Sequence, residues 1–168
     1  MNHPAGTPDE ISFRDAMRDV IGERWEQVWK AVPVAIEGSD PEGVHDVRVA
    51  SRRLRAAMDV AAGAFPNDWY RPLHKLAKQI TRELGAVRDR DVLLASFERD
   101  RDAAPPEEWP GIDLVIARVD GERIAARAEM EDFLKNLETS GSIAETRKRF
   151  PAPEKKKNAA PADEEGAS

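Results

Sequence analysis

The sequence predicts an all-α protein, an antiparallel bundle of about four to six helices followed by a disordered C-terminal tail. Aromatic residues make up only 6% of the 168 residues, and β-branched residues rarely form the runs typical of strands. Hydrophobic residues make up 40%, enough for a core, and they recur mostly three and four positions apart, as on one face of a helix. Proline and glycine gather between these stretches, where helices end.

Three parts are expected along the chain. Residues 1–11 contain two prolines and a glycine and predict a flexible lead, residues 12–150 predict one helical domain, and residues 151–168 have too little to bury and predict the disordered tail. The first helix is expected over 12–36, with Ser12 and Asp15 resembling a capping box. Trp25 and Trp29 lie one turn apart in it. They fit core or interface anchors, with stacking on a ligand as the alternative.

The second and third helices, expected over 41–65 and 69–84, each combine an apolar stripe with a basic one. In the second, the apolar arc includes Val47, Leu54 and Met58, and the opposite arc carries His45, Arg48, Arg52 and Arg55. In the third, the basic stripe carries Arg71, Lys75, Lys78 and Arg82. A short connection favours antiparallel packing, and the two stripes would then flank one groove.

The remaining helices are expected over 91–101, 112–137 and 142–150. Gly85 is expected to loosen or end the third helix, and Asp89 or Asp91 to cap the fourth or to orient neighbouring arginines. A proline-rich connection over 103–110 separates the fourth helix from the fifth. In the fifth, Arg123 falls inside the apolar stripe and Arg127 on its edge, so these arginines either line a polar cleft or extend over their neighbours to solvent.

The charge distribution favours a confined anion site. The net charge is −6, yet residues 45–90 contain ten Lys and Arg against five Asp and Glu, which leaves +5 there and −11 elsewhere. The absence of cysteine excludes disulfides and thiolate sites, and three scattered histidines argue against a metal, so neither metal nor cofactor is expected. No apolar run is long enough to span a membrane and no signal peptide is apparent, so we expect a soluble, cytoplasmic protein.

The basic stripes suit an anion with repeated charges, because successive helical turns place cations about 5.4 Å apart. The alternative is a solvated charged surface. His45, in the first turn of its helix, could donate a hydrogen bond to a phosphate, carry a proton, or bond a loop carbonyl. There is no Ser-His-Asp arrangement, no phosphate-binding glycine loop and no pair of carboxylates suited to acid–base work, so an enzyme is not expected.

Two motifs, separated by the basic third helix, carry a resemblance to a known family. The motifs are His45-x-x-Arg48-Val49-x-x-Arg52-Arg53-Leu54-Arg55 and Leu84-Gly85-x-x-Arg88-Asp89-x-Asp91-Val92. Together they resemble the CHAD family, the conserved-histidine α-helical domains, over about residues 10–150. The resemblance implies two related helical bundles about a pseudo-twofold axis, and binding of inorganic polyphosphate in a basic central cavity. It also implies association with polyphosphate granules and with a triphosphate-tunnel hydrolase, a domain that this sequence does not contain.

The resemblance and the stripes together indicate the candidate polyphosphate-binding residues: His45, Arg48, Arg52, Arg53, Arg55, Lys75, Lys78, Arg82, Arg88, Arg123 and Arg127. Only one helical repeat is visible, so either the chain forms a homodimer that rebuilds the cavity or it binds more weakly across one open face. We expect the homodimer, an expectation also motivated by the four tryptophans. The alternatives are a phosphohydrolase with His45 as acid, an accessory subunit of a triphosphate-tunnel enzyme, and a scaffold whose arginines form internal ion pairs. The acidic net charge and few aromatics argue against nucleic acid as a partner.

Overall fold

The structure, a computed structural model, describes residues 8–38 and 42–153, and the regular elements in these ranges are all helices, as predicted. In chain order the elements are α1 (Pro8–Glu37), α2 (Glu42–Val60), α3 (Asn67–Ala103), the 3-10 turn η1 (Pro106–Glu108), α4 (Trp109–Thr139) and α5 (Ser142–Arg149). Residues 151–153, at the start of the predicted tail, are not helical. The rest of that tail and residues 1–7 of the predicted lead lie outside the described residues.

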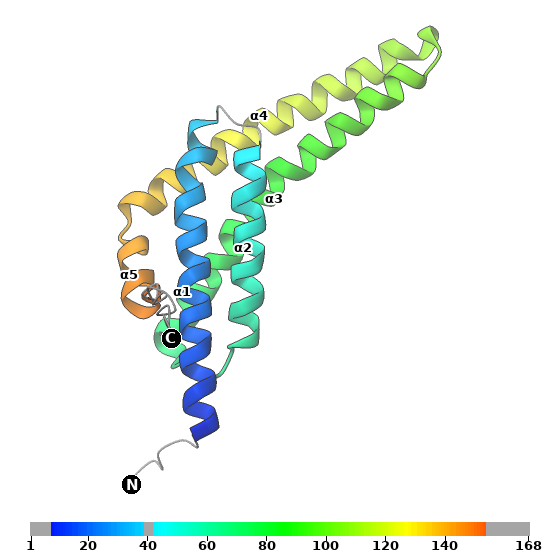
Figure 1. Cartoon of the computed structure of the whole chain (residues 1–168). Helices are drawn as coiled ribbons and strands as arrows, with labels where there is room; N and C mark the ends of the chain where they lie inside the picture. The colour runs from blue at the N-terminus through cyan, green and yellow to red at the C-terminus, as the bar shows by residue number, and fades with distance from the viewer. Residues whose placement is uncertain (1–7, 39–41, 154–168) are drawn as a thin grey trace, which may run out of the picture.

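The helices form a bundle from which one hairpin projects. α1 and α2 lie side by side, α5 lies beside α1, and the second half of α3 leaves the bundle together with the first half of α4 (Figure 1). Ion pairs join this hairpin along its length, from Arg90 to Glu122 and from Arg101 to Asp113. We call this projecting hairpin, residues 90–125, the arm.

Aromatic residues dominate the bundle core. The rings of Trp25 and Trp29 stack with centroids 5.1 Å apart, and Nε1 of Trp29 donates a hydrogen bond of 2.9 Å to Oγ1 of Thr146 on α5. Phe65 stacks on Tyr70, and the buried Phe150 meets both rings at steep angles. Both tryptophans therefore act as core anchors, the first of the two alternatives for them, and the rings tie α5 to α1 and α3.

Gly85 does not end the third helix, so the prediction of a separate fourth helix was wrong. α3 continues through Gly85 to Ala103, and neither Asp89 nor Asp91 is a cap. A glycine inside a helix costs about 1 kcal/mol relative to alanine. The flanking Leu84 and Val87 are buried in the core, and α4 packs along the helix beyond them, which outweighs that cost.

The other predicted bounds shift by a few residues. α1 begins at Pro8 instead of residue 12, with proline at a position where its missing N–H has no partner to lose. α2 ends at Val60 instead of residue 65, and Gly63 turns the chain with a φ of +92°. α4 begins at Trp109, three residues early, directly after η1. α5 is confirmed at Ser142–Arg149.

The arm exposes apolar side chains that the bundle does not cover. Val92, Leu114 and Ile124 are 54%, 74% and 58% exposed, and Leu93 and Val115 are also exposed. A two-helix hairpin can bury only the sides of its helices that face each other, so its outer sides lie open to solvent. Over the described ranges, no helix is both long and apolar enough to cross a membrane.

Candidate functional site

The basic residues of α2 and α3 lie along adjoining sides of two antiparallel helices. A guanidinium nitrogen of Arg48 lies 4.0 Å from a carboxylate oxygen of Asp89, and Nζ of Lys78 lies 3.9 Å from Oδ1 of Asp59. Asp59 follows Arg48 by eleven residues, and Lys78 precedes Asp89 by eleven, so the register is antiparallel over three turns. We call the resulting surface the α2–α3 face: His45, Arg48, Arg52, Arg55 and Asp59 of α2, and His74, Lys75, Lys78, Arg82 and Asp89 of α3.

Part of the α2–α3 face is hollowed along α3. The hollow measures about 420 Å³ and is lined by Lys75, Lys78, Gln79 and Arg82, with no carboxylate among the lining residues. Arg82 is paired with its neighbour Glu83, at 2.8 Å between Nη2 and Oε1. These cations follow one another at spacings of three and four residues, so they share one side of the helix.

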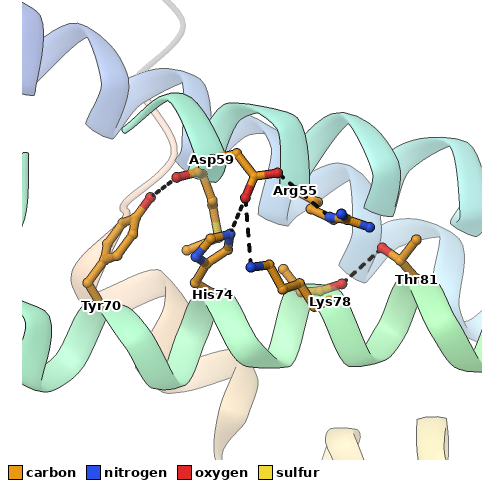
Figure 2. Close-up of polar contacts among 8 residues, drawn as sticks. Arg55, Asp59, Tyr70, His74, Lys78 and Thr81 are labelled. Atoms are coloured by element: carbon orange, nitrogen blue, oxygen red, sulfur yellow. Dashed lines mark hydrogen bonds and ion pairs between the residues drawn. The ribbon is translucent and has the colours of Figure 1, made fainter. Parts of the chain in front are cut away.

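Asp59 is the acidic centre of the face (Figure 2). Its carboxylate lies 2.7 Å from Nε2 of His74, 3.7 Å from Nε of Arg55 and 3.9 Å from Nζ of Lys78. Beside it, the hydroxyl of Tyr70 donates a hydrogen bond of 2.5 Å to the carbonyl of Met58. Burial, and then the negative charge of Asp59, raise the pKa of Tyr70 to about 12, so this phenol stays protonated and serves the fold.

Several cations have no intramolecular counterpart within the described part of the chain. Arg52 and Lys75 on the face, and Arg88 at its edge, make no ion pair or hydrogen bond there. Arg53 is also exposed and has no partner among the described residues, but its position on the helix is rotated by about 100° from that of Arg52. The structure therefore brings Arg52 to the face and turns Arg53 away from it.

His45 and Arg48 stand where α2 begins to pack against α3. Both are partly buried, and His45 Nδ1 and Arg48 Nε are shielded nitrogens that bond to no described residue. A shielded polar atom of this kind costs about 1–3 kcal/mol when it goes unsatisfied. His45 is the fourth residue of α2, at the end of its first turn, as predicted. Its bonding to a loop carbonyl, one of three alternatives, is not seen among the described residues.

Arg123 and Arg127 are engaged by internal partners instead of joining the α2–α3 face. Arg123 donates from Nε and Nη2 to Oδ1 of Asp120, at 2.9 and 2.8 Å. Arg127 lies 2.9 Å from Glu131 and donates to the carbonyl of Ala35 in the last turn of α1. Arg127 therefore joins α4 to the end of α1, which is a structural role.

Sequence reasoning missed the two residues that centre the face. Asp59 and His74 were not candidates, although Asp59 follows Arg55 by one helical turn and so extends the same stripe. The pairing of Asp59 with His74 depends on the register of two helices, which the sequence does not reveal. Asp89 was expected to cap a helix or to orient arginines, and its contact with Arg48 fits the second role.

The described residues contain no cluster of three or more His, Cys, Asp or Glu side chains that could hold a metal ion. What the α2–α3 face offers chemically is a row of six Arg and Lys side chains, four of which have a carboxylate partner in the described part of the chain. A family model described as CHAD domain matches residues 19–166, nearly the whole chain. Searches of curated proteins and of solved structures give no significant match.

Proposed function

This chain belongs to the CHAD domain family, and we propose that it binds inorganic polyphosphate through the α2–α3 face. One observation carries the proposal: two antiparallel helices present cations in register along adjoining sides, and some of those cations, Arg52 and Lys75 among them, have no described counterpart. Cations gathered without matching carboxylates repel one another, and a bound polyanion relieves that repulsion.

The spacing of the cations fits a chain of phosphoryl groups better than a single phosphate. Arg48, Arg52 and Arg55 rise along α2 over two turns, and Lys75, Lys78 and Arg82 along α3 over a similar length. Arginine forks bind phosphoryl oxygens in bidentate fashion, and lysine supplies mobile point charges. A single phosphate would use two or three of these groups, whereas a linear polyanion can engage the length of the face.

We propose binding without catalysis. The described residues offer no metal-ligating cluster and no nucleophile oriented by a base, which a phosphohydrolase would need. Incubating the protein with long-chain polyphosphate and Mg²⁺ tests this directly. We expect no release of phosphate above the protein-free control, and sustained release that depends on His45 would contradict the proposal.

Titration of fluorescently labelled long-chain polyphosphate at low and at moderate salt tests the binding itself. We expect saturable binding that weakens steeply with salt, by the counterion release known for nucleic acids. The double variant Arg48→Ala, Arg52→Ala should bind about a hundredfold more weakly or worse, because charge-assisted contacts contribute about 1.5–3 kcal/mol each and two are lost. Absence of binding at low salt would overturn the proposal, and equal competition by DNA or RNA would favour a general polyanion binder.

We also propose a homodimer in which a second copy covers the open side of the α2–α3 face. The tryptophans no longer motivate it, because Trp25 and Trp29 are buried and Trp69 and Trp109 are engaged in internal contacts. The exposed apolar residues of the arm are the better support. Sedimentation at high protein concentration should give a dimer mass, and a monomer mass would remove this part of the proposal.

Two cellular consequences are part of the proposal. A polyphosphate-binding chain should gather at polyphosphate granules, and it could serve as the accessory subunit of a triphosphate-tunnel enzyme. A fluorescent fusion should colocalise with granules, and the variant Arg48→Ala, Arg52→Ala should not. If the unaltered fusion and the variant fusion gather at granules equally, granule association does not depend on the α2–α3 face.

A further inference from the structure

Asp59 holds a position that helix electrostatics alone disfavours. It lies in the last turn of α2, which ends at Val60, and the partial negative charge at the end of a helix repels a carboxylate. The surrounding cations offset this, since Arg55, His74 and Lys78 all lie within 4.0 Å of its oxygens and come from both helices (Figure 2). Asp59 thus sits where the α2–α3 face attracts negative charge.

The three contacts differ in strength. The His74 contact, at 2.7 Å, is a hydrogen bond, and the His74 side chain is only 15% exposed. The Arg55 and Lys78 contacts, at 3.7 and 3.9 Å, are too long for hydrogen bonds. Both side chains are about half exposed, so they remain free to turn toward another anion at little cost.

We propose that Asp59 is an internal counter-anion of the α2–α3 face, which competes with a bound polyanion for Arg55 and Lys78. This inference rests on the proposed function. In the free protein the carboxylate reduces repulsion between these cations and orients His74. In the complex a phosphoryl group takes over Arg55 and Lys78, and Asp59 keeps its hydrogen bond to His74. Asp59 thereby lowers the affinity of the face, although it is surrounded by its binding residues.

Neutralising Asp59 without changing its shape should therefore tighten binding. A negative charge about 4 Å from a phosphoryl group in a water-exposed setting changes affinity about fivefold. We expect Asp59→Asn to bind long-chain polyphosphate about fivefold more tightly than the unaltered protein at low salt. The gain should shrink as salt screens the removed repulsion.

Asp113→Asn is the matched control. It removes the same charge, and its carboxylate is likewise paired with an arginine, Arg101, but it lies on the arm. We expect its affinity to stay within about twofold of the unaltered protein, since charges beyond a Debye length are screened. An equal gain in both variants would trace the effect to net charge and overturn the proposal.

The outcomes separate this proposal from the proposed function. If neither the unaltered protein nor Asp59→Asn binds polyphosphate at low salt, both the proposed function and the counter-anion role are refuted. If the unaltered protein binds and Asp59→Asn binds equally or more weakly, only the counter-anion role is refuted. As a check that needs no variant, NMR of the unaltered protein should show the His74 imidazole resonances shift as polyphosphate saturates, because the charge next to Asp59 changes. Unchanged His74 resonances at saturation would contradict the proposal.

Discussion

Arg52 and Arg53 offer an internal comparison for testing whether the α2–α3 face binds polyphosphate. They are adjacent, exposed and of the same residue type, and neither has an ion-pair partner among the described residues. Arg52 lies on the face, and Arg53 points about 100° away from it. Arg52→Ala and Arg53→Ala alter net charge equally, so any difference in their binding reports the position of the cation.

The expected magnitude follows from the number of cations on the face. Six of them, Arg48, Arg52, Arg55, Lys75, Lys78 and Arg82, would give a slope of log K against log salt of about −4, using about 0.7 per cation for a single-stranded polyanion. Affinity should then fall roughly 300-fold between about 50 and 200 mM salt. Arg52→Ala should make the slope shallower by about 0.7, and Arg53→Ala should leave it unchanged.

Fluorescence anisotropy of labelled long-chain polyphosphate at four salt concentrations measures these slopes. Thermal unfolding of each variant serves as the control for folding, and both should match the unaltered protein because neither arginine is buried. Equal loss of slope in the two variants would refute the reasoning, because binding would then follow net charge and not the α2–α3 face.

Three further predictions concern the fold. Gly22→Ala should destabilise by about 1–3 kcal/mol in urea unfolding, since the added methyl would lie 2.6 Å from a backbone oxygen just beyond α5. Thr146→Val should cost about 1–3 kcal/mol by leaving the buried indole N–H of Trp29 without its acceptor, which the same measurement checks. The hydrogen bond from Arg147 lowers the pKa of Glu26, so the ionised form stabilises the fold at neutral pH and this stability is lost as pH falls through the lowered pKa. Glu26→Gln should therefore melt lower than the unaltered protein at neutral pH, with a smaller further loss on acidification.

Much of the fold could be predicted from the sequence because the governing signals are local. The apolar and basic arcs of α2 are set by a period of 3.6 residues, and a short connection made the antiparallel pairing of α2 and α3 the natural expectation. The continuity of α3 could not be predicted in the same way. The cost of Gly85 is local, whereas the packing of Leu84 and Val87 that outweighs it is tertiary.

The same distinction between local and tertiary information applies to the candidate site. Which residues carry positive charge is written in the sequence, but which of them are neutralised depends on the partners that the fold supplies. Arg123 and Arg127 resemble Arg52 in the sequence, yet the fold gives them Asp120 and the end of α1 as partners. Arg52 receives no counterpart in the described part of the chain. Internal partners therefore hold Arg123 and Arg127 in place on α4, whereas Arg52 stays available to a ligand.

Substitution of Gly85 should change stability and binding in opposite directions. Gly85 lies inside α3 and is not among the glycines with a positive φ, and a methyl group added there would meet no atom within 4 Å, so neither backbone conformation nor packing requires glycine. Asp59 of α2 contacts Lys78 of α3, and the two helices are antiparallel. Arg52 precedes Asp59 by seven residues and Gly85 follows Lys78 by seven, so Arg52 and Gly85 lie opposite each other. The missing side chain therefore leaves open space beside an unpaired cation.

Gly85→Leu should consequently raise stability while it weakens binding. Leucine improves helix propensity over glycine by somewhat less than the roughly 0.8–1.0 kcal/mol that separates alanine from glycine, and urea unfolding would measure the gain. The same side chain would fill the space beside Arg52, and we expect about tenfold weaker polyphosphate binding, the loss of one charge-assisted contact. Gly121→Leu, an open glycine within α4 on the arm, should give the stability gain without the binding loss. If Gly85→Leu binds as tightly as Gly121→Leu, the polyanion does not pass between Arg52 and α3, and the face must be engaged nearer to Lys75 and Arg82.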